Sequence, residues 1–161
     1  MTNWILPGGS LTEFRSNSPG ETQALGQLIA RRLGPGRTLA IQGALGAGKT
    51  CLTKGIARGL GVSEELTSPT YTIVSEYEAR PPGGPPLPLY HIDAYRLSGE
   101  DDFEAIGGRD LLYGGGICLI EWAERIREAL PPGTIFVEID ISGETGRIIR
   151  VFTGISGEDE P

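Results

Sequence analysis

The stretch Gly43-Ala44-Leu45-Gly46-Ala47-Gly48-Lys49-Thr50 decides the fold of this chain, because it matches the pattern G-x-x-x-x-G-K-[ST] in full. An apolar run, Thr38-Leu39-Ala40-Ile41, comes directly before it. After it, Leu52, Ile56 and Leu60 fall on one face of an expected helix. A buried strand, a glycine-rich turn and an amphipathic helix in this order predict a phosphate-binding P-loop.

The residue types in this turn predict ATP and Mg²⁺ as its ligands. Glycines let the backbone N–H groups converge on an anion without interference from Cβ atoms. The helix that follows directs the positive end of its dipole at the same point. We expect Lys49 to reach the β- and γ-phosphates, and the Thr50 hydroxyl to bind Mg²⁺.

A P-loop needs a second acid to hold or order the metal, and this acid commonly ends an apolar strand. Two carboxylates fit. Ile117-Cys118-Leu119-Ile120 is followed by Glu121, and Leu89-Tyr90-His91-Ile92 is followed by Asp93. The first run is the more apolar, but the strand pattern alone leaves both candidates open.

Composition and charge narrow the class of protein. The chain has 161 residues and a net charge of −7, which suits one globular domain and gives no general attraction to nucleic acid. The first residues lack the pattern of a signal peptide, and no apolar run is long enough to span a bilayer. We therefore expect a cytoplasmic protein with one P-loop ATPase domain over residues 1–155 and a disordered acidic tail over 156–161.

The other segments predict the elements around the P-loop. Ser18-Pro19-Gly20-Glu21 reads as a capping box that starts a helix. Proline and glycine over 80–88 predict an exposed loop, and Ser98 is expected to cap a short helix. Segments 135–141 and 148–152 alternate as a closing hairpin. The fold class expected is α/β: a single-domain P-loop NTPase sandwich with a partly parallel central sheet and antiparallel edge strands.

Several classes of P-loop protein can be tested on the residues present. The guanine-reading Asn-Lys-x-Asp motif of GTPases is absent, because neither Asn3 nor Asn17 is followed by lysine. The Leu-Ser-Gly-Gly signature of transport ATPases is absent too. A small-molecule kinase stays open, since Arg109 or Arg125 could belong to a lid.

Four segments together resemble one family. They are GALGAGKT from Gly43, TSPTYTIVSEY from Thr67, HIDAYRL from His91 and ICLIEWAER from Ile117. In combination they resemble the TsaE (YjeE) family of bacterial ATPases, which is required for threonylcarbamoyladenosine in the anticodon loop of tRNA. Their order and spacing cover most of the chain.

The resemblance implies roles for the matching residues. It implies ATP contacts along Leu45, Gly46, Ala47, Gly48, Lys49 and Thr50, and Mg²⁺ held by Thr50 and Glu121. It places Thr70 in a loop that senses the γ-phosphate, and gives Asp93 the part of ordering the attacking water or the metal's water shell. Pro19 and Gly146 correspond to parts of the family that line the nucleotide.

The resemblance also implies an activity and partners. It implies a Mg²⁺-dependent ATPase that is weak alone and is stimulated by TsaD- and TsaB-like proteins, with tRNA bound indirectly. Departures from the usual family residues occur at Ala44, Cys51 and Ala94, none of which is a predicted phosphate or metal ligand. A nucleotide-dependent binding switch with negligible hydrolysis stays open beside the kinase.

Overall fold

The computed structural model describes residues 11–67 and 73–153, so the predictions for Thr70 and for the acidic tail lie outside the described residues. Its elements, in chain order, are β1 (Thr12–Ser16), α1 (Pro19–Ala30), β2 (Thr38–Gly43), α2 (Lys49–Gly59), β3 (Val74–Ala79), β4 (Leu87–Asp93), the 3-10 helix η1 (Ala94–Arg96), α3 (Glu100–Ala105), α4 (Gly108–Tyr113), β5 (Ile117–Glu121), the 3-10 helix η2 (Ala123–Ala129), β6 (Ile135–Ile141) and β7 (Arg147–Thr153).

The strands form one seven-stranded sheet in the order β1-β7-β6-β2-β5-β4-β3. Its centre is parallel, because β2 pairs in parallel with both β5 and β6, and β4 pairs in parallel with β5. At one edge β7 and β1 run antiparallel, and at the other β3 runs antiparallel to β4. The predicted α/β class, with a partly parallel centre and antiparallel edges, is confirmed.

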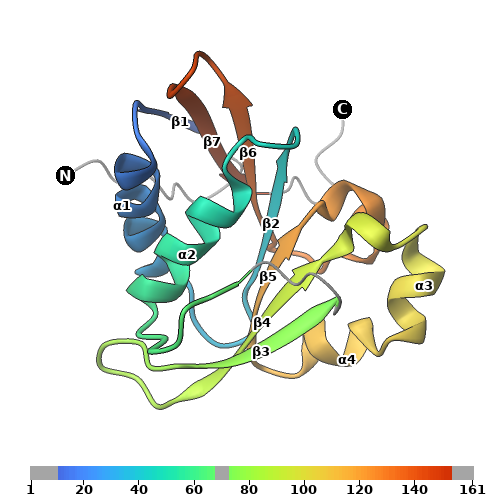
Figure 1. Cartoon of the computed structure of the whole chain (residues 1–161). Coiled ribbons are helices and arrows are strands. Elements are labelled where there is room, and N and C mark those ends of the chain that lie inside the picture. The colour runs from blue at the N-terminus through green and yellow to red at the C-terminus, as the bar shows by residue number, and fades with distance from the viewer. Residues whose placement is uncertain (1–10, 68–72, 154–161) are drawn as a thin grey trace.

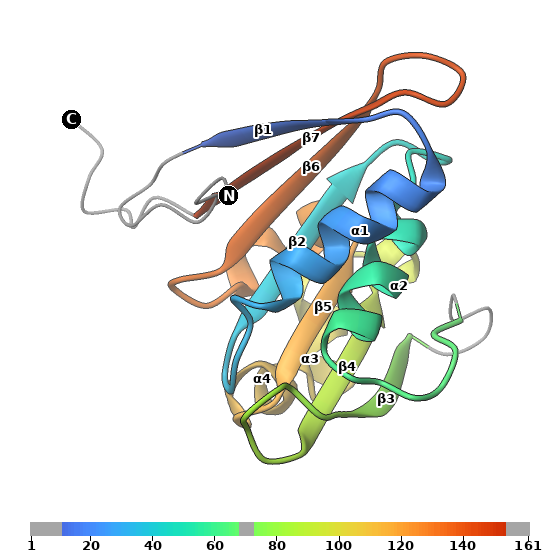
Figure 2. The same cartoon turned by 90° about the vertical axis from the view of Figure 1, so that its left-hand side faces the viewer.

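Helices cover both faces of this sheet. In Figures 1 and 2, α1 and α2 lie side by side over one face, and α3 and α4 lie over the other. The buried side chains divide in the same way. One cluster includes Ile29, Leu52 and Leu119 between the sheet and the first helix pair, and the other includes Phe103 and Ile120 on the opposite face.

Close packing of α1 against α2 fixes the helix that follows the P-loop. A Cβ atom on Gly26 would come within 2.6 Å of the Leu52 carbonyl oxygen, and one on Gly55 within 2.3 Å of the Gln23 carbonyl oxygen. Both positions therefore require glycine for the helix backbones to approach this closely. Ser18 is the N-cap of α1 as predicted, since its hydroxyl accepts a hydrogen bond from the Glu21 amide at 3.1 Å. The Glu21 carboxylate accepts from the Asn17 amide at 2.7 Å, one residue before the N-cap.

Two local expectations were wrong. Ser98 does not cap the short helix, because Gly99 is the N-cap of α3 and Ser98 instead donates through its amide and its hydroxyl to Asp102. The loop predicted over 80–88 is shorter, since Pro88 pairs with Glu78 inside β4. Proline is tolerated there because the parallel pairing with β5 begins one residue later, at Leu89.

Candidate functional site

The P-loop runs from the end of β2 to the start of α2 with glycines where the backbone needs them. Gly46 and Gly48 have φ of 80° and 103°, in the left-handed region that other residues rarely adopt. A Cβ atom at either glycine would have no neighbouring atom within 4 Å, so the space in front of the loop is open. Backbone and space together suit the approach of a phosphate group.

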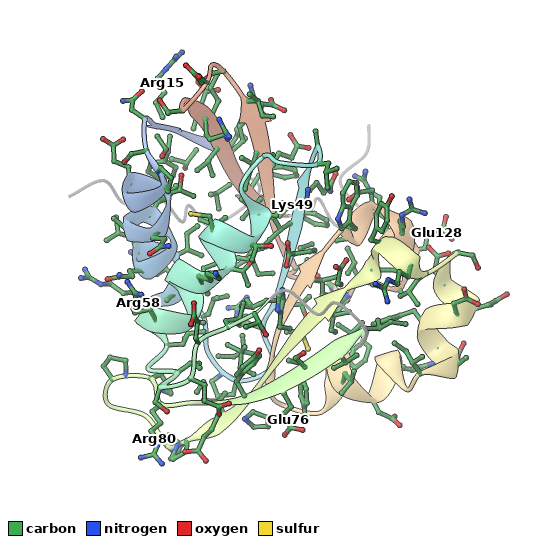
Figure 3. The ribbon with its side chains drawn as sticks, viewed as in Figure 1. Arg15, Lys49, Arg58, Glu76, Arg80 and Glu128 are labelled. Carbon is green, nitrogen blue, oxygen red and sulfur yellow. The ribbon has the colours of Figure 1, made fainter. Side chains whose placement is uncertain are left out.

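Lys49 is the first residue of α2 and is only 6% exposed. Its ammonium donates hydrogen bonds to the carbonyl oxygens of Gly43 at 2.6 Å and Ala44 at 2.9 Å. Burial lowers the pKa of this ammonium, while nearby carboxylates oppose the shift, the largest contribution among them being that of Glu121. Figure 3 shows Lys49 at the N-terminal end of the helix, so the positive charge lies at the base of the loop.

Glu121 ends β5 and joins two predicted site residues. Its Oε1 accepts a hydrogen bond from the Thr50 hydroxyl at 3.1 Å. Its Oε2 lies 2.5 Å from Nε2 of His91, which is fully buried, and Glu121 itself is 4% exposed. Each oxygen of this carboxylate therefore has its own partner, which fixes the orientation of the side chain.

Asp93 lies next to Glu121 in the sheet. The two are register partners across β4 and β5, so the two candidate acids end neighbouring parallel strands. Oδ1 of Asp93 accepts a hydrogen bond from the Tyr95 amide at 3.0 Å. The structure thus brings both acids to the site, and Glu121 is the one in contact with Thr50.

A cleft of about 350 Å³ lies between the P-loop and these strand ends. Leu45, at the tip of the loop, is 85% exposed at its rim. Residues of the P-loop and α2 line the cleft on one side and residues at the ends of β4 and β5 on the other: Leu45, Gly46, Gly48, Lys49, Thr50, Cys51, Asp93, Tyr95, Glu121 and Trp122. The cleft thus contains predicted phosphate contacts, both candidate acids and the helix N-terminus.

A smaller pocket of about 160 Å³ lies on the other side of the P-loop, under the turn between β6 and β7. Pro19, at the start of α1, lines it together with Ala47, Gly48 and Cys51. From the hairpin, Thr145 and Arg147 line it on either side of Gly146 in the chain. Of the two outlying positions implied by the resemblance, Pro19 lines this pocket, whereas Gly146 does not line it and lies in the chain between two residues that do.

Two aromatic side chains in contact, Tyr95 and Trp122, line one side of the cleft. The sequence did not predict this contact. The Trp122 ring lies 4.1 Å from the Lys49 ammonium and 4.9 Å from the Tyr95 ring. Among the described residues other than glycine, Trp122 alone has a positive φ, at 57°. The signal in the sequence was its position directly after Glu121. Nothing in the sequence pointed to Arg147, whose contacts depend on where the hairpin turn meets the P-loop.

Comparison with known proteins agrees with this geometry. The family model described as Threonylcarbamoyl adenosine biosynthesis protein TsaE matches residues 16–149. The chain belongs to the TsaE family. The family that the motifs resemble is thereby confirmed, together with its role in threonylcarbamoyladenosine biosynthesis.

Individual TsaE relatives match most of the chain. The tRNA threonylcarbamoyladenosine biosynthesis protein TsaE of Treponema pallidum (strain Nichols) is 43% identical and covers 84% of this chain and 96% of its own length. That of Bacillus subtilis (strain 168) is 41% identical and covers 92% of this chain and 89% of its own length. The crystal structure of Bacillus subtilis YdiB superposes with a TM-score of 0.69 at 38% identity, covering 91% of this chain and 87% of that one.

The TsaE assignment and the P-loop together support nucleotide binding in the cleft. Within residues 11–67 and 73–153, no helix has the length and apolar character needed to cross a membrane.

Proposed function

We propose that the cleft binds ATP with Mg²⁺ and that the chain hydrolyses ATP as part of the tRNA threonylcarbamoyladenosine machinery. The observation that carries this proposal is the contact of Thr50 with Glu121 at 3.1 Å, beside an open P-loop. It sets a hydroxyl oxygen and a carboxylate oxygen next to the place where phosphates would lie.

The residues present fit a magnesium ion. Mg²⁺ in nucleotide sites is held by one or two protein oxygens, with the remaining positions filled by phosphate and water. Thr50 and Glu121 offer such a pair of oxygens, and Glu121 is held in place through His91. When bound, the ion would neutralise charge on the phosphate oxygens during transfer.

The protein's own groups would bind and orient the nucleotide. Lys49 would exchange its contacts with the Gly43 and Ala44 carbonyls for contacts with the β- and γ-phosphates. Asp93, whose carboxylate is oriented by the Tyr95 amide, would hold the attacking water. Trp122, whose ring lies against the Lys49 ammonium, would shield that charge from water.

The proposed setting is the bacterial cytoplasm, with TsaD- and TsaB-like proteins as partners. In this assignment the chain supplies ATP-driven conformational change, tRNA is reached through the partners, and the isolated chain turns over slowly. The one-domain boundary at residue 155 and the acidic tail beyond it stay predictions, as does the role of Thr70.

The test is a titration of the full chain with ATP and GTP, with and without Mg²⁺, followed by single-turnover hydrolysis with and without the partner proteins. We expect a preference for ATP, release of free phosphate and stimulation by the partners. A phosphorylated acceptor in place of phosphate would show a kinase. ATP binding without any hydrolysis, partners present, would show a binding switch. Either result would overturn the ATPase assignment.

A further inference from the structure

The Arg147 side chain connects two parts of the molecule that are far apart in sequence. Its Nε donates to the Ala47 carbonyl at 2.8 Å and its Nη2 to the Gly46 carbonyl at 3.2 Å, both in the P-loop. Its Nη1 donates to the carbonyls of Gly146 at 2.7 Å and Gly143 at 3.2 Å, both in the turn between β6 and β7. One guanidinium thus holds four main-chain carbonyls.

The two P-loop bonds fix the direction of peptide planes. In a trans peptide the carbonyl oxygen and the following N–H point in opposite directions. Because Arg147 holds the Ala47 carbonyl, the Gly48 amide points away from Arg147. The Ala47 amide is held as well, since it donates to the Ala44 carbonyl at 3.0 Å within the loop. The orientation of the amide at the start of α2 therefore depends on a side chain of β7.

The guanidinium is chemically suited to this position. It presents its donors in a rigid plane, whereas a lysine ammonium is a single point on a flexible stem. None of its four acceptors carries a formal charge. By contrast Arg150, three residues further along β7, forms ion pairs with Glu13 and Asp140.

We propose that Arg147 is a positioning residue for the phosphate site: it orients the P-loop amides and couples the loop to the β6–β7 turn. This rests on the proposed function in so far as the ligand is a nucleotide di- or triphosphate. Arg147 acts on the phosphates through Gly46 and Ala47. A movement of the hairpin turn is transmitted to the loop through the same four bonds.

Figures 1 and 2 show the β6–β7 turn and the β2–α2 loop at the same end of the sheet. The turn residues Glu144 and Thr145 are exposed. A partner that binds them and moves the turn would therefore also move the P-loop, through the hydrogen bonds of Arg147. The pocket lined by Pro19, Thr145 and Arg147 lies between the two connected parts and would change shape with them.

The experiment compares Arg147→Met, Arg147→Lys and the control Arg150→Met in the full chain. ADP binding without Mg²⁺ is measured by calorimetry, the free energy of unfolding by urea, and the Gly46 and Gly48 amide signals by NMR of the ligand-free protein. We expect Arg147→Met to weaken ADP binding about tenfold or more, Arg147→Lys to recover part of that loss, and Arg150→Met to leave ADP binding unchanged. The Gly48 amide signal should shift in both Arg147 variants.

Equal ADP affinity in wild type and Arg147→Met would overturn the positioning role. So would a Gly48 signal that shifts no more in the Arg147 variants than in Arg150→Met. If Arg147→Met does not fold, Arg147→Lys carries the same comparison. Failure of wild type and Arg150→Met alike to bind ADP would instead reject the proposed function, and the Gly48 signal in the ligand-free chain would still decide whether Arg147 orients the loop.

Discussion

The two sides of the cleft are built in different ways. The P-loop side is one continuous stretch, Gly43–Thr50, and its open glycines offer main-chain groups. The opposite side joins Asp93 and Glu121, which are distant in sequence and meet because β4 and β5 pair in parallel. One side depends on local backbone conformation and the other on the topology of the sheet.

This difference determines what a substitution can reveal. On the P-loop side most contacts come from the backbone, so few side-chain changes report on it directly, Lys49 being the main exception. On the strand side the groups are side chains with named partners, so single substitutions can separate metal binding, water positioning and stability.

The largest effect is expected for Lys49→Ala. Loss of the ammonium beside the phosphates should weaken ATP binding by about a hundredfold or more, measured by calorimetry with Mg²⁺. The free energy of unfolding should change by no more than about 1 kcal/mol, because relief of a buried charge offsets the two lost hydrogen bonds. Lys54→Ala, at a partly exposed position of the same helix, is the control and should bind ATP as wild type does.

The second prediction separates the two acids. Glu121→Gln should weaken ATP binding about tenfold in the presence of Mg²⁺ and have little effect without it, because an amide is a poorer ligand for a hard cation. Asp93→Asn should keep the affinity and reduce the single-turnover rate about a hundredfold or more. The reverse pattern, with the Mg²⁺ effect lost in Asp93→Asn, would exchange the two assignments.

The third prediction concerns His91, which supports Glu121 from inside the sheet. His91→Phe should lower the free energy of unfolding by about 1–3 kcal/mol, because the buried Glu121 carboxylate loses a hydrogen-bond partner. It should also weaken the Mg²⁺-dependent part of ATP binding, measured as for Glu121→Gln. His91→Gln, which can still donate to the carboxylate, should recover part of both losses; if it recovers neither, His91 only fills space.

The smallest effect expected is a pH dependence of the free energy of unfolding, caused by a buried thiol in β5. Burial raises the pKa of the Cys118 thiol to about 12, from an ordinary value of 9.0. The folded state therefore holds this proton more tightly than the unfolded state does. Stability from this source is complete below pH 9 and is lost from there up to about pH 12, at about 1.4 kcal/mol per pH unit. Urea unfolding of wild type and Cys118→Ala at pH 8 and pH 10 should show the steeper loss in wild type.

Most of the fold could be predicted because its signals are local. The P-loop stretch, the helix N-cap at Ser18 and the alternation of the closing hairpin each depend on neighbouring residues. The edge strand β1 and the helix α4 were not predicted; both are short, at five and six residues, and depend on packing against the rest of the domain.

The residues of the candidate site could be predicted from the sequence, but most of the hydrogen bonds between them could not. Thr50, Glu121 and Asp93 were identifiable from strand ends and the P-loop pattern. The contact between His91 and Glu121 is diagonal across neighbouring strands, because the register partner of Glu121 is Asp93 and that of His91 is Leu119. The contact of Arg147 with the P-loop depends on the position of a turn. Such contacts between residues 30 and 100 positions apart leave no periodic pattern in the sequence.

The backbone of Glu121 is paired on both sides, with Ile41 in β2 and Asp93 in β4. Amide protons in such a central ladder exchange with solvent only when a large part of the domain opens. We therefore expect slow amide hydrogen exchange in the backbone of Glu121, the acid that we assign to the metal. Leu45, on the facing loop, is largely exposed. We therefore expect that motion in the proposed nucleotide cycle involves mainly the loop, the helices and side-chain torsions. Deuterium uptake around Glu121 should hardly change when nucleotide binds.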